Sequence, residues 1–231
     1  MLGTPRTVLA VLATALLLSS CTGGSDSSDS PDEPDASSSL APEERPPGKA
    51  EAVESGLGVD GQRAVGVAVV QNQSSTDGQS IRVDFAFQTK AGRTVTTVSR
   101  SASFADSDQS LVVVGQADLT GLDAKVAAVD VSVTVTNADV VPLAAGLKVT
   151  GGKVADTKAG PTATFTVVNE SEDDLVAGAL AVACRNARGS IIGGGFASVP
   201  ALEPGERLMV RAGDLVLSGP AERCSASPAS A

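Results

Sequence analysis

The side chain best suited to acid-base chemistry at neutral pH is missing from this 231-residue sequence, which contains no histidine. The chain therefore cannot form a Ser-His-Asp or Cys-His nucleophile pair, a histidine general base or a zinc site with histidine ligands. Gly151-Gly152-Lys153 matches the end of a phosphate-binding loop, but Leu147 and Val154 stand where that motif needs Gly and Ser or Thr. Carboxylates, lysines and three cysteines remain as the groups able to do chemistry.

The acidic residues offer only part of a metal site. Asp106-Ser107-Asp108 begins like a calcium-binding loop, but Leu111 and Ala117 replace the Gly and the Glu that such a loop requires. We therefore expect a solvated turn here, with no metal and no cofactor. For an enzyme, the remaining alternative is a carboxylate-only site, such as the Asp and Glu pair of a glycosidase.

Cys21 has the surroundings of a lipid attachment site. The uncharged apolar run from Val8 to Leu18 is too short to span a bilayer, which takes about 20 residues. It ends in Leu18-Ser19-Ser20-Cys21, which resembles the lipobox of bacterial lipoprotein precursors. The resemblance implies that residues 1–20 are a signal peptide and that Cys21 carries a diacylglyceryl group and a further acyl chain such as palmitate. The protein would then sit on the outer face of the bacterial cell membrane, whereas ordinary secretory cleavage without lipid is the alternative.

Residues 21–55 have the composition of a tether. Ser, Pro, Asp, Glu and Gly dominate, so the segment cannot build a core. Between Thr22 and Lys49 there are two basic and seven acidic residues, a net charge of 2 − 7 = −5. Because like charges extend a flexible chain, we expect a disordered acidic spacer.

The charge of the remaining chain limits its partners. The full chain carries −10; removing the one cation of the signal peptide gives −11, and subtracting the −5 of the spacer leaves −6 from Ala50 onward. The sequence shows no basic stripe and has five Phe but no Trp or Tyr. Nucleic acid requires clustered cations and stacking rings, so we expect no nucleic-acid partner. The same features argue against anionic lipid and sugar.

The body after the spacer has the periodicity of β-strands. Apolar and mainly polar residues alternate from Ile81 to Gln88 and from Val129 to Thr136, which predicts strands with one buried face. Val and Thr are abundant, and no long stretch after Leu18 has helical spacing. We predict an all-β body.

An internal repeat divides this body. The segments ending at Asn72 and at Asn169 both run from a strand into a polar turn. An alternating strand, a Gly-containing hairpin, another strand and a turn before an apolar strand follow each of them. This order predicts two tandem antiparallel β-sandwiches, residues 56–145 and 146–231, with the boundary between residues 137 and 161.

The second copy also contains Leu202-Glu203-Pro204-Gly205 before its late apolar strand. With the Asn turn and the Gly hairpin, this order resembles the small immunoglobulin-like domains of bacterial surface lipoproteins, such as the FxLYD type. The aromatic residues typical of those domains are missing, and the first copy lacks the Pro-Gly pair. The resemblance implies an extracytoplasmic immunoglobulin-like module and supplies no catalytic residues.

Cys184 and Cys224 remain once Cys21 is assigned to lipid. Both lie in the second copy and outside the cytoplasm, so we predict a disulfide between them. The loop of about 40 residues that it closes would stabilise the fold by about 4 kcal/mol under the chain-entropy model. A redox role would instead favour a Cys-x-x-Cys motif, which is absent.

The candidate partner surface comprises the loops at Asn72 and Asn169 and the strand containing Gly193, Gly194 and Gly195. Glycines in a strand predict a β-bulge or close packing, with close approach of a ligand as the alternative. The two Asn residues match the N-glycosylation pattern, but in a bacterial protein we expect them to start turns. The function predicted is non-enzymatic binding of a protein or envelope component.

Overall fold

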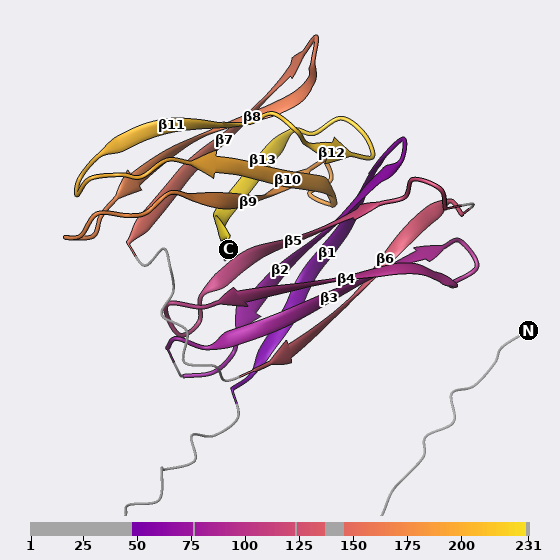
Figure 1. The fold of residues 1–231 in the computed structure, drawn as a ribbon, viewed down its shortest axis with the longest axis horizontal. Helices are drawn as coiled ribbons and strands as arrows, with labels where there is room; N and C mark the ends of the chain where they lie inside the picture. Colours follow the sequence, from indigo (N-terminus) through magenta and orange to yellow (C-terminus); the bar gives the residue numbers. More distant parts are fainter. Residues whose placement is uncertain (1–47, 76, 123, 137–145, 230–231) are drawn as a thin grey trace, which may run out of the picture. The chain divides into compact units, whose positions relative to one another are not determined.

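The computed structural model describes residues 48–75, 77–122, 124–136 and 146–229 (Figure 1). The predicted signal peptide, Cys21 and most of the predicted spacer lie outside these residues. Every regular element in the described part is a β-strand, which confirms the all-β prediction. No helix of the described part is long and apolar enough to cross a membrane.

The first six strands form two antiparallel sheets, called here the N-terminal sheet pair. One sheet has the order β1-β2-β5 and consists of β1 (Ala50–Asp60), β2 (Arg63–Asn72) and β5 (Ser110–Asp118). The other has the order β4-β3-β6 and consists of β3 (Ser80–Thr89), β4 (Thr94–Ser103) and β6 (Val126–Val135).

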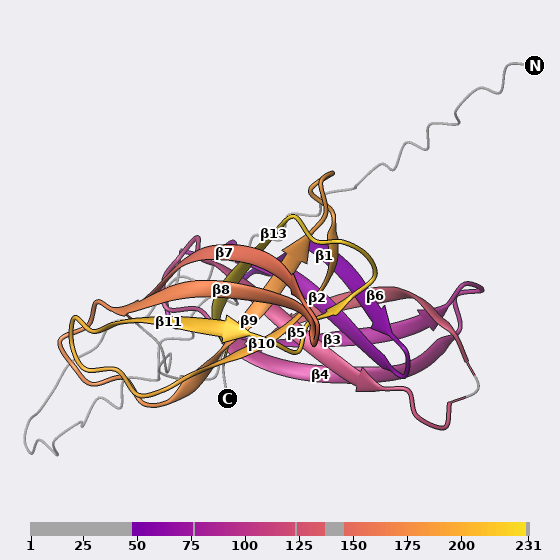
Figure 2. The same cartoon turned by 90° about the horizontal axis from the view of Figure 1, so that it is seen from above.

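The remaining strands form the C-terminal sheet pair. The sheet β11-β8-β7, seen from above in Figure 2, consists of β7 (Leu147–Thr157), β8 (Gly160–Asn169) and β11 (Arg207–Ala212). The sheet β12-β10-β9-β13 consists of β9 (Gly178–Arg185), β10 (Ile191–Val199), β12 (Val216–Leu217) and β13 (Arg223–Ala229). The strand order of the first pair therefore repeats, because β1-β2-β5 matches β7-β8-β11 and β4-β3-β6 matches β10-β9-β13. Strand β12 is an addition.

Each pair encloses its own core. In the N-terminal pair, alternation along β3 buries Ile81, Val83, Phe85 and Phe87 completely, as the sequence pattern predicted. The Phe85 ring lies on two glycines that face each other across β2 and β5, and a methyl group at either position would crowd the ring. In the C-terminal pair the corresponding core gathers around Phe165, Leu180 and Leu202.

A third hydrophobic cluster joins the two pairs along a contact that we call the seam. It lies between the sheets β1-β2-β5 and β12-β10-β9-β13 and contains Val65, Val67, Val112, Val114, Ala181, Ala183, Ile191 and Val216. Strands β2, β5 and β9 are consequently buried on both faces, which explains why their sequences are nearly continuous apolar runs. Residues 48–229 thus form one compact unit.

The element boundaries differ from the sequence expectation at the start of the body. Strand β1 begins at Ala50, so residues 50–55, which we expected in the spacer, pair with β2. The reason is composition: residues 50–55 of this edge strand are mainly small or charged and mostly exposed, so they have the residue content of a linker. Within the predicted boundary interval, residues 137–145 lie outside the described residues, and β7 begins at Leu147.

Candidate functional site

Cys184 and Cys224 form the predicted disulfide. They stand directly opposite each other on β9 and β13, with 4.1 Å between their Cα atoms. Both are buried in the core of the C-terminal sheet pair. The bond therefore links neighbouring strands of one sheet and has a structural role. Cys21, the predicted lipid acceptor, lies outside the described residues.

Asn72 is a fully buried turn residue. Its Oδ1 accepts hydrogen bonds from the backbone N–H of Ser74 (3.0 Å) and from the Ser74 hydroxyl (2.8 Å). Its Nδ2 donates to the Asp106 carbonyl (3.1 Å), and its backbone N–H donates to the Gln109 carbonyl (2.9 Å). The side chain thus joins the end of β2 to the turn that precedes β5.

Asn169 makes a similar set of bonds in the second copy and is also fully buried. Its Oδ1 accepts from the N–H (2.9 Å) and hydroxyl (2.6 Å) of Ser171, and its Nδ2 donates to the carbonyls of Asp173 (2.8 Å) and Leu202 (3.1 Å). Its backbone N–H donates to the Glu206 carbonyl (3.0 Å) just before β11. The turn prediction is confirmed for both Asn residues. The Asn-x-Ser spacing is explained by the Ser donor two positions later.

Gly193, Gly194 and Gly195 are buried in β10 beneath the N-terminal sheet pair. The register with β9 shifts between Ile191 and Gly193, where φ is +138°, so the predicted bulge is present. A Cβ atom at Gly193 would overlap the Val216 carbonyl and come within 2.9 Å of the Cα of Gly58. Gly193 and Gly194 thus allow two sheets of the same chain to approach, whereas a Cβ atom at Gly195 would meet Asp214 and Leu215 of its own sheet pair. The structure places all three glycines in internal contacts.

Charged side chains reinforce the rim of the seam. The Arg63 guanidinium lies 2.6 Å from Asp214, and Arg185 lies 3.0 Å from Glu54. The hydrogen bond to Asp214 raises the pKa of Arg63 above its ordinary value. Because Asp214 and Glu54 are at least half exposed, while the Arg185 side chain is only 14% exposed, we assign these pairs to alignment of the two sheet pairs more than to stability.

Two serines satisfy the free edges of the sheet β1-β2-β5. The Ser218 hydroxyl accepts from the Val59 N–H (3.1 Å) and donates to the Leu57 carbonyl (3.0 Å) on β1. On β5, Val112 donates its N–H to the Ser227 hydroxyl (2.8 Å), which donates to the Val112 carbonyl (3.3 Å). Both serines belong to the C-terminal pair, so each edge strand of this sheet is bonded to that pair at one point.

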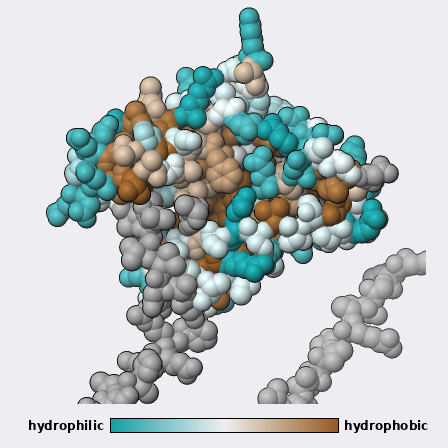
Figure 3. All heavy atoms as spheres, in the orientation of Figure 1, coloured by the Kyte–Doolittle hydropathy of each residue, from teal (hydrophilic) through white to brown (hydrophobic). Residues whose placement is uncertain are grey.

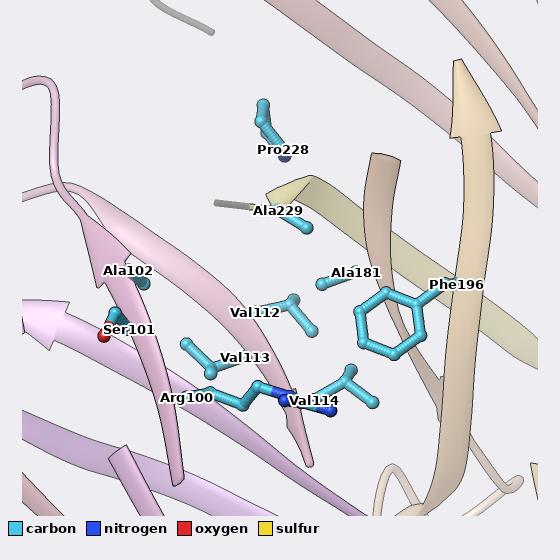
Figure 4. Close-up of a pocket in the computed structure, with 10 residues that line it drawn as sticks. All are labelled: Arg100, Ser101, Ala102, Val112, Val113, Val114, Ala181, Phe196, Pro228 and Ala229. Atoms are coloured by element: carbon cyan, nitrogen blue, oxygen red, sulfur yellow. The ribbon is translucent and has the colours of Figure 1, made fainter. Parts of the chain in front are cut away.

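A small pocket opens at the seam, where Phe196 from β10 points towards Val112 and Val114 from β5 (Figure 4). Arg100 and Ala229 lie at its border. Its volume of about 30 Å³ is enough for a water molecule and too small for an organic ligand.

The face of the molecule seen in Figure 3 shows hydrophobic residues at the surface, with polar residues around them.

A larger depression of about 370 Å³ contains two carboxylates, Asp60 and Asp156. Leu215, Leu217 and Pro220 also line it. Asp60 has a 66% exposed side chain and an ion-pair contact of 3.6 Å with Arg63, and Asp156 is exposed as well. Neither carboxylate has the desolvated surroundings that a general acid requires.

The carboxylates with perturbed titration lie elsewhere. Hydrogen bonds from Ser99 and then from Arg82 lower the pKa of Asp84 on the outer face of β3. Hydrogen bonds from the hydroxyl and backbone N–H of Thr120 lower the pKa of Asp118. Both arrangements keep a carboxylate ionised, which is the opposite of what an acid catalyst needs at neutral pH.

Comparison with known proteins found no match: no protein-family model matches the chain, and no curated protein matches it in sequence.

Proposed function

We propose that this chain is a bacterial lipoprotein, held by lipid on Cys21 at the outer face of the cell membrane, that binds an envelope component without catalysis. The lipobox and the acidic spacer support the anchor. The repeated strand order and the two separate cores support the reading of each sheet pair as an immunoglobulin-like β-sandwich.

The observation that carries the binding role is the seam. A continuous apolar cluster, buried glycines and serine-capped edges fix the two pairs to each other, so the body is a rigid platform. Because Asn72 and Asn169 are buried in their own turns and the glycine strand is buried at the seam, we now assign binding to the outer sheet faces. Rigid faces suit recognition because binding then orders few additional groups.

Metabolic labelling tests the anchor. Labelled palmitate should enter the wild-type protein and not Cys21→Ala, whereas a Cys184→Ser/Cys224→Ser variant should keep the label because its lipid acceptor is intact. Recovery of the wild-type chain as a soluble protein with an unmodified N-terminus would contradict the anchor.

The binding role is tested separately from the anchor. The Cys21→Ala chain, which lacks the lipid acceptor, should still sediment with isolated envelope fragments. The Asp60→Asn/Asp156→Asn variant removes the two carboxylates of the 370 Å³ depression, where a carboxylate enzyme would have its site. It should sediment equally, because binding is assigned to the outer sheet faces. A hydrolytic activity that this pair of substitutions abolishes, with folding intact, would replace the binding role by the carboxylate-enzyme alternative.

A further inference from the structure

The outer face of the sheet β11-β8-β7, called here the basic face, collects positive charge on an acidic protein. Pairing across the three strands aligns Arg207 with Lys148 on either side of Val168. Four residues away along β8, it aligns Arg211 with Lys153 on either side of Thr164. All four cationic side chains are exposed. Four cations therefore occupy the corners of a rectangle on one sheet face.

The sides of this rectangle follow from strand geometry. Neighbouring strands lie about 5 Å apart and each residue rises about 3.4 Å, so the backbone positions that carry the cations lie about 10 Å apart across the sheet and about 13 Å apart along it. Arg207 and Arg211 are four residues apart and share a face by ordinary alternation. Lys148 and Lys153 are five apart, which would place them on opposite faces of a regular strand.

A bulge brings Lys153 to the same face as Lys148. The register between β7 and β8 shifts between Gly151 and Lys153, so one extra residue is accommodated. Gly151 and Gly152 have φ values of +97° and +108°, a backbone conformation that favours glycine. The double glycine that looked like part of a phosphate-binding loop thus has a different effect: it reverses the side-chain alternation and turns the second lysine outwards.

Few carboxylates oppose these cations. Lys148 pairs with Glu170 at 2.7 Å, and both side chains remain more than half exposed. Within the described ranges, no ion pair engages Arg207, Arg211 or Lys153. Arg211 makes one long hydrogen bond, 3.4 Å, to the Thr162 hydroxyl. The basic face therefore retains most of its charge for an external anion.

The middle strand carries shorter and less exposed side chains than its neighbours. Thr164, Thr166 and Val168 on β8 have short side chains and are half-buried, while the residues beside them on β7 and β11 are exposed. Met209, opposite Thr166, is 74% exposed. Long cationic side chains thus stand on both sides of a strip that offers two hydroxyl groups.

We propose that the basic face binds a linear, phosphate-bearing polyanion of the cell envelope, which lies along β8 between the two rows of cations. Arginine forks match phosphate oxygens bidentately, and lysines add point charges on the other side. This inference rests on the proposed binding role and names its partner class, and it does not require the lipid anchor.

The geometry favours a polymer chain over the other anionic surfaces. A membrane surface is a plane, so it would contact the long cationic side chains and leave the half-buried hydroxyl groups of Thr164 and Thr166 on β8 unused. Single-stranded nucleic acid is usually bound with aromatic platforms, and the nine aligned positions of the basic face contain no aromatic residue. A narrow chain of phosphates uses both cation rows at once.

Fluorescein-labelled inorganic polyphosphate is the probe, because the protein lacks Trp and Tyr for intrinsic fluorescence. Anisotropy with the full-length Cys21→Ala chain should show binding of the probe. The logarithm of the association constant should fall with the logarithm of the salt concentration at a slope of about −3, as expected for four phosphate contacts on a single-stranded polyanion. Between 50 and 200 mM salt this slope corresponds to a loss of roughly 50-fold in affinity.

Variants of the basic face test the site. Arg207→Gln/Arg211→Gln and Lys148→Gln/Lys153→Gln should each halve the salt slope and weaken binding at least about 10-fold, because each removes two contacts. The matched control is Arg93→Gln/Arg188→Gln, which removes two exposed cations from hairpin turns and should change affinity less than about 2-fold.

A second pair of variants keeps the cations and alters the strip. Thr166→Glu places a negative charge between the two rows and should abolish binding, whereas Thr97→Glu on the exposed face of β4 should not. Circular dichroism and the melting temperature of every variant establish that each one is folded.

Three outcomes would overturn the inference. Equal losses in face and control variants would mean that the probe responds to the protein's total number of cations and not to the basic face. Face-dependent binding to phosphatidylglycerol vesicles without binding to polyphosphate would make the face a membrane contact. Much tighter binding of single-stranded DNA than of polyphosphate would make it a nucleic-acid site. If lipid labelling and envelope sedimentation persist in any of these cases, the proposed function stands and only this partner class fails.

Discussion

The two sheet pairs use the same strand order with opposite chemistry on corresponding faces. The bonds from Asn72 to Gln109 and from Asn169 to Glu206 align β2 with β8 and β5 with β11. Under this alignment Val112 and Val114 correspond to Met209 and Arg211. In the N-terminal pair the face is apolar and is buried in the seam, whereas in the C-terminal pair it is basic and exposed. The same strand order therefore presents an apolar packing face in one copy and an exposed charged face in the other.

The cores of the two pairs also differ. The N-terminal core contains three buried phenylalanines, Phe85, Phe87 and Phe104, while the C-terminal core contains Phe165 and the disulfide. What the copies share is the turn chemistry of the buried Asn residues. The two copies thus share the buried Asn turns that connect their strands. They differ in how the core is stabilised, by several phenylalanines in one copy and by one phenylalanine and a disulfide in the other.

Removal of the central ring of the N-terminal core should have the largest effect on stability. Phe85→Ala should lower the free energy of unfolding by about 3 to 5 kcal/mol, because it empties a fully buried site against two glycines that cannot fill it. Urea denaturation followed by circular dichroism measures this. Phe196→Ala, at a half-buried position on the seam, is the control and should cost clearly less. Equal costs would mean that the seam is packed as tightly as the core.

The disulfide should have the corresponding effect in the C-terminal pair. Cys184→Ser/Cys224→Ser should lower the free energy of unfolding by about 4 kcal/mol, the chain-entropy value for a loop of 40 residues. Reductant should destabilise the wild type by a similar amount and leave the variant unchanged. Reaction of both cysteines with a thiol reagent in the native, unreduced protein would contradict the bond.

The seam decides whether the two pairs unfold together. Gly194→Val should destabilise by about 1 to 3 kcal/mol or more, because a side chain there meets the Val182 carbonyl and Val67. In the wild type we expect one unfolding transition, and in the variant two. Gly178→Val is the matched control, since its added side chain would meet open space. Two transitions already in the wild type would mean that the seam does not couple the pairs.

The sequence predicted the all-β class and the repeat from the order and periodicity of its segments, the two Asn turns from residue type, and the disulfide from the two cysteines left after Cys21. Each of these depends on local pattern or on the small number of cysteines. The alternation along β3, for example, already specifies which face of that strand is buried.

The seam and the basic face could not be predicted in the same way. The apolar runs in β2 and β5 indicated burial on both faces but not the covering partner, which lies more than 60 residues away. Lys148, Lys153, Arg207 and Arg211 form no stripe in the sequence, and only strand pairing and the Gly151 bulge assemble them. The expectation of a body without a basic stripe is therefore correct for the linear sequence and wrong for the folded surface.

The shared Asn turns should respond alike in the two pairs. Asn72→Ala and Asn169→Ala should each lower the free energy of unfolding by about 1 to 3 kcal/mol, because each leaves buried backbone groups without partners. Asn186→Ala, in the β9–β10 turn, should cost less because its partners at Arg188 and Ser190 are exposed to water. A loss confined to one of the two buried sites would show that the copies do not share this device.

The smallest effect concerns acid sensitivity, and it belongs to the N-terminal pair. Hydrogen bonds from Ser99 and Arg82 lower the pKa of Asp84, so its contribution is present above the unfolded pKa and is lost as the pH falls through the folded pKa. Ser99→Ala removes the largest cause and should raise the pKa of Asp84 towards its ordinary value near 4. The variant should then be slightly less stable than wild type at neutral pH, and the difference should disappear below the folded pKa. Carboxyl NMR titration measures the shift directly, with Asp118 as the internal control because Thr120 sets its pKa independently. An unchanged Asp84 titration in Ser99→Ala would assign the lowered pKa to Arg82 alone.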